Sequence, residues 1–181
     1  MRIIALLVVA ALGIWVGFVY NRLVGLRNRA VSSWSDIEVQ SKRRWDLIPN
    51  LVETVKAYAK HEDSVFSKVS EARSAAMTAK TPAEHAAAEN ALSSTLKSLF
   101  AVAEAYPALQ SAGNFLDLQQ NLADAEDKIQ SARRFYNGNV RDYNTRLQQF
   151  PTNLVGGTLG FKTREFFQAP GEQMEAPSVK F

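Results

Sequence analysis

The 181-residue chain contains no cysteine and only two histidines. Without thiols it can form neither a disulfide framework nor a thiolate metal site. Metal sites in helical bundles place a Glu three residues before a His, but Tyr58 precedes His61 and Pro82 precedes His85 at that spacing. Glu89 lies one turn after His85, and such a pair on an alanine-rich surface helix is typical of a local contact. We therefore expect no metal and no other cofactor.

Motifs of the common enzyme classes are also missing. No serine stands in a G-x-S-x-G turn, and no phosphate-binding glycine loop is present. Gly156 and Gly157 follow a helical pattern, which favours helix termination. No segment alternates apolar and polar residues between turn residues, so no strand is expected. These absences predict an all-α protein that is not an enzyme and has no catalytic, cofactor-binding or metal-binding residues.

An uninterrupted apolar run covers Ile3 to Tyr20, between Arg2 and Arg22. As a helix it would span roughly 27 Å, close to the hydrocarbon core of about 30 Å. A cleaved signal peptide is the alternative. A small-residue cleavage site at Val9 to Ala11 would leave a very short apolar region and a mature chain that begins with more apolar residues. The run therefore predicts a membrane anchor, residues 1–21, that contacts the lipid bilayer through Ile3 to Tyr20.

The basic residues around the run bear on orientation. Arg2 and the terminal amine lie on one side, while Arg22, Arg27 and Arg29 lie on the other. The positive-inside rule then favours a cytoplasmic C-terminal domain on a single-pass protein of the bacterial inner membrane. The count is close, and both orientations stay open at this stage.

A second basic cluster, Lys42 to Arg44, invites two other interpretations. If one helix continues from the anchor, Lys42 lies roughly 33 Å beyond Tyr20, whereas screening acts over about 8 Å, so lipid headgroups are out of reach. Nucleic-acid binding needs a broader basic face than a chain of net charge +3 offers. We therefore expect solvated charges at the rim of a bundle, and no nucleic-acid partner.

Beyond the anchor, apolar or small residues recur at steps of three and four, which indicates one helical face. The pattern continues through Pro49, which predicts one kinked, continuous helix; two helices that meet at 46–50 are the alternative. A weaker stripe from Val65 to Ala76 follows a break near 61–64. The first stripe comprises Ala30, Trp34, Ile37, Ser41, Trp45, Ile48, Val52, Val55 and Ala59.

A third helix should begin at Thr81, which can cap it. Pro82 suits the first helical position, and Glu84 can complete a capping box. The helix should end near Tyr106, because Pro107 disfavours helical geometry in the residue before it. Its stripe comprises Leu92, Leu96, Leu99 and Ala103.

A fourth helix is predicted from Asn114, with Asp117 in the third capping-box position, to Phe150 and Pro151. Gly138 lies inside it and favours a local irregularity. Its stripe comprises Leu118, Leu122, Ala125, Ile129, Ala132, Tyr136, Val140, Tyr143 and Leu147. Helices with one apolar stripe bury it against each other, which predicts an elongated antiparallel bundle over residues 22–160.

The tail, residues 161–181, is rich in Pro, Gly, Gln and Glu, and we expect disorder after about residue 168. Phe161, Phe166 and Phe167 are expected to pack onto the end of the bundle, with a docking motif as the alternative.

One polar row on the fourth helix offers an alternative function. It comprises Tyr136, Asn137, Arg141, Tyr143, Asn144 and Arg146. Such a row could line the cleft of a hydrolase or a lipid-modifying enzyme. It is more typical of the hydrogen-bonded shell of a bundle, where Tyr buries its ring and keeps its hydroxyl bonded.

Several sequence blocks resemble one known family. DLIPNLV at 46–52, EARSAA at 71–76, AVAEAYPALQ at 101–110 and the FYN and VRDYN blocks at 135–144 are similar to the LemA family of bacterial membrane proteins. The resemblance covers nearly everything after the anchor. It departs from the family at Gly138, Asn139 and the KTREFF ending.

The resemblance implies one N-terminal membrane helix followed by a bundle of long helices, without an enzymatic activity or catalytic residues. The expected function is a membrane-tethered scaffold or interaction protein, with protein partners or self-association as a homo-oligomer, and no small-molecule ligand.

Overall fold

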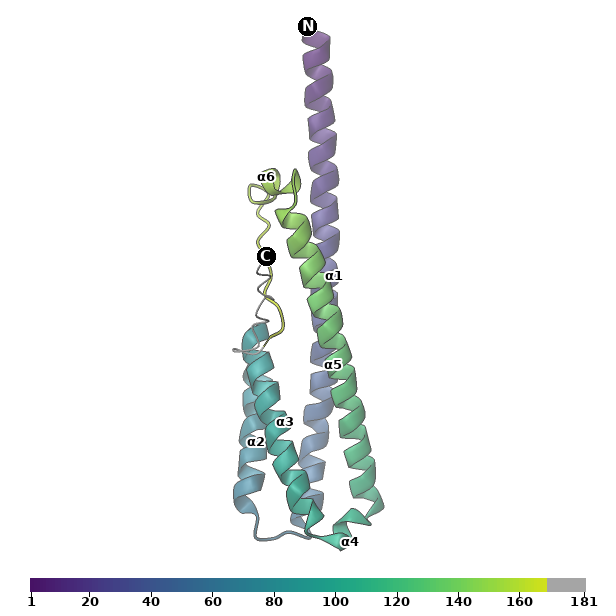
Figure 1. Ribbon diagram of the computed structural model, residues 1–181, viewed down its shortest axis with the longest axis vertical. Coiled ribbons are helices and arrows are strands. Elements are labelled where there is room, and N and C mark those ends of the chain that lie inside the picture. Colours follow the sequence, from purple (N-terminus) through teal and green to yellow (C-terminus); the bar gives the residue numbers. More distant parts are fainter. Residues whose placement is uncertain (169–181) are drawn as a thin grey trace, which may run out of the picture. The chain divides into compact units, whose positions relative to one another are not determined.

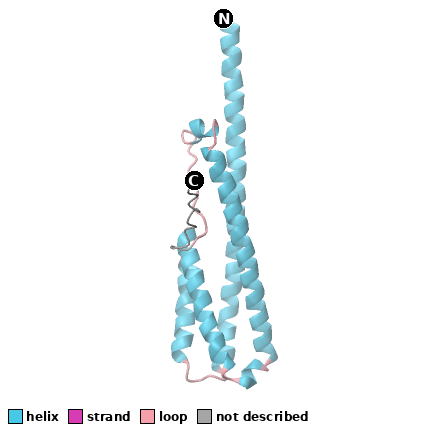
Figure 2. Cartoon of the chain, in the orientation of Figure 1, coloured by secondary structure: helices cyan, strands magenta, loops and turns pink. Residues whose placement is uncertain are grey.

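The computed structural model describes residues 1–168 (Figure 1). Within that range every regular element is a helix (Figure 2), which confirms the all-α class and the long apolar N-terminal helix followed by other helices. The disorder predicted after residue 168 falls outside the described residues. The helices are α1 (Arg2–Lys56), α2 (Asp63–Thr78), α3 (Pro82–Glu104), α4 (Pro107–Gln110), α5 (Gly113–Gln148) and α6 (Thr152–Gly156).

Helix α1 passes through Pro49 without interruption. The continuous helix is therefore confirmed, and the alternative of two helices that meet at 46–50 is wrong. Pro49 has no N–H, so the carbonyl of Trp45, four residues earlier, lacks its helical donor. Arg73 of α2 replaces that donor, since its Nε donates to the Trp45 carbonyl at 2.8 Å.

The predicted capping box at the start of α3 is present. The Thr81 hydroxyl accepts from the Glu84 N–H at 3.2 Å, and the Glu84 carboxylate accepts from the backbone N–H groups of Thr81 and Lys80. These backbone donors, Lys80 first, lower the pKa of Glu84. The box works because each side chain satisfies an N–H that has no partner inside the helix.

Helix α5 differs in detail from its prediction. It begins at Gly113, so Asn114 lies inside the first turn instead of capping it. The helix continues through Gly138 without the expected irregularity. The short helices α4 and α6 were not predicted, because four or five residues are too few to show helical periodicity.

The described chain forms two compact units. The first contains Met1–Asp36 and Arg134–Phe166. In it the C-terminal part of α5 and the residues that follow pack on α1. Its buried apolar cluster comprises Val19, Leu23, Tyr143, Leu147 and Phe161.

Within the described residues, the second unit contains Ile37–Arg133 and residues 167–168. Here the C-terminal part of α1, then α2, α3 and the start of α5 run in alternating directions (Figure 1). The predicted stripe of α3 is buried, and so are Ile37, Ile48 and Val55 on α1. The core of this unit includes Trp45, Ile48, Leu51, Val55, Phe66, Val69, Leu92, Leu96, Leu99, Leu109 and Phe115.

Candidate functional site

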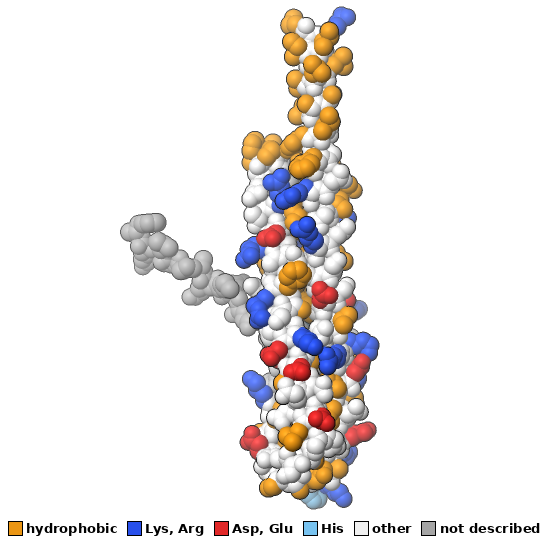
Figure 3. Space-filling model, turned by 90° about the vertical axis from the view of Figure 1, so that its right-hand side faces the viewer, with side chains coloured by type: hydrophobic (Ala, Val, Ile, Leu, Met, Phe, Trp, Pro, Cys, Tyr) orange, Lys and Arg blue, Asp and Glu red, His pale blue; other side chains and the backbone are white. Residues whose placement is uncertain are grey.

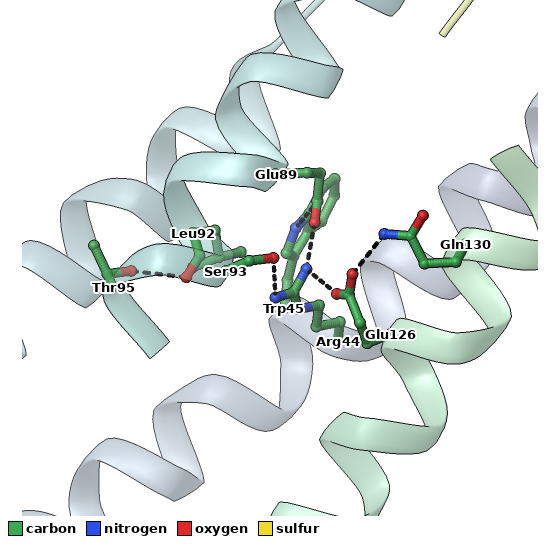
Figure 4. A network of polar contacts seen from close by, with 8 residues as sticks. All are labelled: Arg44, Trp45, Glu89, Leu92, Ser93, Thr95, Glu126 and Gln130. Atoms are coloured by element: carbon green, nitrogen blue, oxygen red, sulfur yellow. Dashed lines mark hydrogen bonds and ion pairs between the residues drawn. The ribbon is translucent and has the colours of Figure 1, made fainter. Parts of the chain in front are cut away.

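A cluster of polar side chains in the second unit surrounds Arg44. This arginine is 3% exposed, and α1 presents it to both α3 and α5. Its Nη1 lies 2.9 Å from Glu89 Oε2 and 2.8 Å from Glu126 Oε2, and its Nη2 donates to the Ser93 hydroxyl at 2.8 Å (Figure 4). Gln130 Nε2 donates to the other Glu126 oxygen at 2.8 Å. One guanidinium therefore joins three helices.

The second oxygen of Glu89 is also occupied. Trp45 Nε1 donates to Glu89 Oε1 at 2.8 Å, and Glu89 is fully buried. The ring of His85 stacks on Trp45 at a centroid distance of 6.4 Å and is itself buried. A buried carboxylate needs such partners, because leaving water without them is costly.

Two predictions fail here. Arg44 was expected to be a solvated rim charge, but only Lys42 and Arg43 of that cluster are exposed. His85 and Glu89 were expected on a surface helix, but both are buried in the core. Arg44 and Glu89 are buried together, so that neither charge lies in the core without a partner of opposite sign. His85 is buried beside them, where its ring stacks on Trp45.

The sequence did carry a signal for these residues. Arg44 lies three residues after Ser41 and four before Ile48, so it is in phase with the apolar stripe of α1. Glu89 lies three residues before Leu92, in phase with the stripe of α3. Opposite charges that both interrupt apolar stripes indicate a buried pair, because unpaired charges are almost never buried.

A groove of about 720 Å³ lies beside the network, between α3 and α5. Its apolar lining includes Leu96, Phe100 and Leu122. The ring of Phe100 meets that of Phe115 edge to face at a centroid distance of 6.2 Å, which is typical of aromatic pairs. Its polar lining includes Arg44 of α1, Asn90, Ser93 and Lys97 of α3, and Gln119, Glu126 and Gln130 of α5.

The predicted polar row of α5 holds the segment that follows α6. The hydroxyl of Tyr136 donates to the Glu165 carbonyl at 2.9 Å, and that of Tyr143 donates to the Lys162 carbonyl at 2.8 Å. Asn144 donates to the Arg164 carbonyl and accepts from the Arg164 N–H, both at 2.9 Å. These side chains therefore form a hydrogen-bonded shell, as expected of such a row.

Two arginines of the row differ from these residues. Arg141 is exposed, and Arg146 Nη1 contacts the Gln149 side chain at 3.5 Å. Burial raises the pKa of both Tyr136 and Tyr143, against the opposing effect of nearby arginines. Both hydroxyls therefore keep the proton that they donate to a higher pH than an ordinary tyrosine does.

The three phenylalanines of the tail differ in their exposure to solvent. Phe161 and Phe167 are buried, as expected, whereas Phe166 is exposed. Phe161 contacts Tyr20 edge to face at 5.6 Å and lies under the Arg27 guanidinium at 5.6 Å. Phe167 lies under Arg133 at 4.5 Å.

Both clusters, the Arg44 network and the polar row of α5, hold separate segments of the chain together. The first ties α1, α3 and α5 through one cation and two carboxylates, and the second ties α5 to the backbone of 162–165. Among residues 1–168, no group of three or more acidic or histidine side chains is arranged to hold a metal ion. The geometry defines an all-α protein with a helix long and apolar enough to cross a membrane, and a bundle joined by a buried arginine–glutamate network.

Comparison with known proteins identifies the group to which it belongs. The chain is a member of the LemA family, whose family model matches residues 33–181. The family predicted from the sequence blocks is therefore confirmed.

Individual relatives share little more than a quarter of their aligned residues with this chain. Magnetosome protein MamQ 2 of Paramagnetospirillum magneticum is 28% identical over 196 residues, which cover 91% of this chain and 72% of the relative. MamQ of Magnetospirillum gryphiswaldense is 28% identical over 82% of this chain and 64% of its own length. Protein LemA of Metamycoplasma hominis is 26% identical over 84% of this chain and 72% of its own.

Proposed function

We propose that this LemA-family chain is a non-enzymatic, membrane-tethered scaffold whose helical bundle contacts other proteins or further copies of itself. The observation that carries the tether is the exposure of the apolar run. Leu6, Val8, Val9 and Ile14 are all more than half exposed and are spread around the whole circumference of α1. A helix that is apolar all round belongs in a core or a membrane, and residues 3–14 have no core around them.

The same helix supplies a matched test. Val9 in the middle of the run and Val39 beyond it are 67% and 62% exposed. Arginine at the centre of a spanning helix costs about 2.5–3.5 kcal/mol of insertion, whereas arginine at an exposed position outside the membrane costs little. We expect Val9→Arg to move much of the protein out of the carbonate-resistant membrane fraction and Val39→Arg to leave it there. Equal fractionation of the two variants would contradict the tether.

Support for a scaffold comes from what the polar side chains do. The Arg44 network and the tyrosines of α5 bind groups of their own chain, which favours a structural role over the hydrolase or lipid-modifying alternative.

The groove between α3 and α5 is the proposed contact surface. Lys97 lines it, while Lys128 is an exposed lysine of α5 outside it. We expect Lys97→Glu to reduce the crosslinked partner or homo-oligomer recovered from intact cells, and Lys128→Glu to leave the recovery unchanged. Mass spectrometry of gently solubilised membranes provides the readout. A strictly monomeric, partnerless wild-type protein would contradict the scaffold.

We further propose that the bundle lies in the cytoplasm of a bacterium, with the anchor in the inner membrane. Arg22, Arg27 and Arg29 follow the run, against Arg2 and the amine before it. A C-terminal fusion to a reporter that is active only in the cytoplasm should be active. An inactive fusion, with an active periplasmic reporter, would reverse the orientation.

A further inference from the structure

A corner of the first unit packs on the end of the apolar run. We define the α5–α6 corner as residues 147–161, which include the end of α5, all of α6 and the turn after it. Leu147 and Phe161 share a buried cluster with Val19 and Leu23 of α1. Trp15 packs against the same cluster, so the corner covers α1 as far back as this tryptophan.

The part of the run that the corner leaves uncovered is too short to cross a membrane. Residues 3–14, which precede the covered stretch, would span only about 18 Å as a helix, well short of a hydrocarbon core of about 30 Å. The full run to Tyr20 is long enough. If α1 crosses a membrane, the residues that cover Trp15 to Tyr20 must therefore enter the membrane with it, to a depth of about 9 Å. Amphipathic elements at membrane interfaces reach depths of about 5–10 Å.

The corner has the composition that this position requires. Residues 147–161 contain no Asp, Glu, Lys or Arg. Phe150 and Leu154 point outward and are 77% and 65% exposed. Large apolar side chains this exposed are costly in water but favourable in a lipid interface.

Basic side chains follow directly. The first unit contains nine Lys and Arg against three Asp and Glu, and the corner is bounded by Arg146 and Lys162. Figure 3 shows the apolar side chains at the N-terminal end and a group of Lys and Arg side chains next to them. An apolar layer followed by cations fits a bilayer with anionic headgroups, since each cation near the surface gains about 1 kcal/mol there.

We propose that the α5–α6 corner is a second membrane-contacting element, which inserts Phe150 and Leu154 into the lipid interface beside the anchor. The occupant of this apolar surface is lipid, because the surface is continuous with the exposed face of the run. The inference rests on the proposed tether: without a membrane around α1, the corner has none to enter. It adds a fixed depth for the first unit, set by two elements instead of one helix.

The absence of cysteine makes a direct depth measurement possible. Single cysteines at Phe150, Leu154, Val9 and Phe135 would each carry a nitroxide label in the full chain, reconstituted into phosphatidylethanolamine–phosphatidylglycerol vesicles. Phe135 is the matched control, since it is also an exposed phenylalanine of the first unit, at 62%, and lies about 22 Å from Phe150 along α5. Oxygen relaxes labels in lipid, and a water-soluble nickel complex relaxes labels in water.

The expected pattern is oxygen-dominated relaxation at Val9, Phe150 and Leu154, and nickel-dominated relaxation at Phe135. If nickel relaxes the labels at Phe150 and Leu154 while the label at Val9 remains in lipid, the proposed membrane contact of the α5–α6 corner is wrong and the membrane anchor still stands. A label at Val9 that relaxes with nickel would overturn both. Strong spin–spin broadening at Phe150 would assign the surface to a second copy of the chain, which also overturns the proposal.

Discussion

Arg73 Nε donates a hydrogen bond of 2.8 Å to the carbonyl oxygen of Trp45, the group that Pro49 leaves without a helical donor. The Arg73 side chain thus supplies the hydrogen bond that α1 lacks at Trp45, and it joins α2 to α1. It also explains how α1 remains one helix through a proline that would ordinarily break it.

This hydrogen bond predicts that the effects of two substitutions on stability depend on each other. Arg73→Leu should lower the free energy of unfolding by about 1–3 kcal/mol, because the Trp45 carbonyl loses its donor. In a Pro49→Ala background the new backbone N–H can serve that carbonyl, so the same substitution should cost less. Denaturant unfolding of the full chain in detergent would measure all four variants. Lys68→Leu, which removes an exposed cation of α2, is the control. If the effects of Arg73→Leu and Pro49→Ala on the free energy of unfolding simply add, Arg73 does not replace the missing donor.

The Arg44–Glu89 pair predicts a large loss of stability when one partner is removed. Arg44→Ala leaves a fully buried carboxylate without its cation, which should cost about 3–5 kcal/mol. Glu89→Gln should cost less, because the amide oxygen can still accept from Trp45 and Arg44 keeps Glu126. Lys42→Ala, which removes only an exposed ion pair with Asp46, should change the stability by at most about 1 kcal/mol. Thermal unfolding would rank the three, and equal losses for Arg44→Ala and Lys42→Ala would contradict a buried network.

The two buried tyrosines predict a loss of stability in alkali. Burial raises the pKa of Tyr136 and Tyr143 above the value of about 10 in the unfolded chain. Below pH 10 both states hold the protons and the stability is fully present. Above it the unfolded chain releases them first, so stability falls as the pH rises toward the folded-state pKa values. Unfolding measured from pH 8 to 11 would show the fall.

Phenylalanine variants separate this effect from the hydrogen bonds. Tyr143→Phe should lose about 1 kcal/mol at neutral pH, with the bond to the Lys162 carbonyl, and should lose less stability on going to pH 11 than the wild type. Tyr58→Phe is the control for removal of an exposed hydroxyl. An unchanged alkaline fall in the Tyr143→Phe variant would show that this residue does not contribute.

Two adjacent glycines predict opposite results. A Cβ at Gly156 would lie 2.5 Å from Leu147 Cδ1, inside a buried cluster, whereas a Cβ at Gly157 would meet nothing within 4 Å. Gly156→Ala should therefore destabilise the protein by about 1–3 kcal/mol through overpacking. Gly157→Ala, at a helical φ of −65°, should be neutral or stabilising by up to about 1 kcal/mol. Melting temperatures of the two variants would decide, and a harmless Gly156→Ala would mean that Leu147 can move aside.

Much of the fold follows from periodicity. The stripes of α1, α3 and α5 recur every three or four residues over many turns, so their helices and buried faces are readable from the sequence. The capping box at Thr81 is equally readable, because its residue types and spacing are specific. Helix α6 is too short to carry such a pattern, and its Val155 packs against a cluster that includes Leu23 of α1, which is remote in sequence.

The charged network was harder to predict for a different reason. Arg44 was judged by its distance from the membrane, although its phase within the stripe indicated burial. Glu89 was judged by its alanine-rich neighbours, which suggested a surface. Neither residue can be assigned alone, because burial of each depends on the other, and only the folded arrangement brings together positions 45 residues apart.

All the bonds from the tyrosines and Asn144 of α5 to residues 162–165 end on backbone atoms. The identity of the side chains in that segment is thus separate from what holds it in place. Lys162, Arg164 and Glu165 can be exchanged during evolution without releasing the segment. A lineage could retune the charge of this surface to a different lipid composition while the fold stays the same.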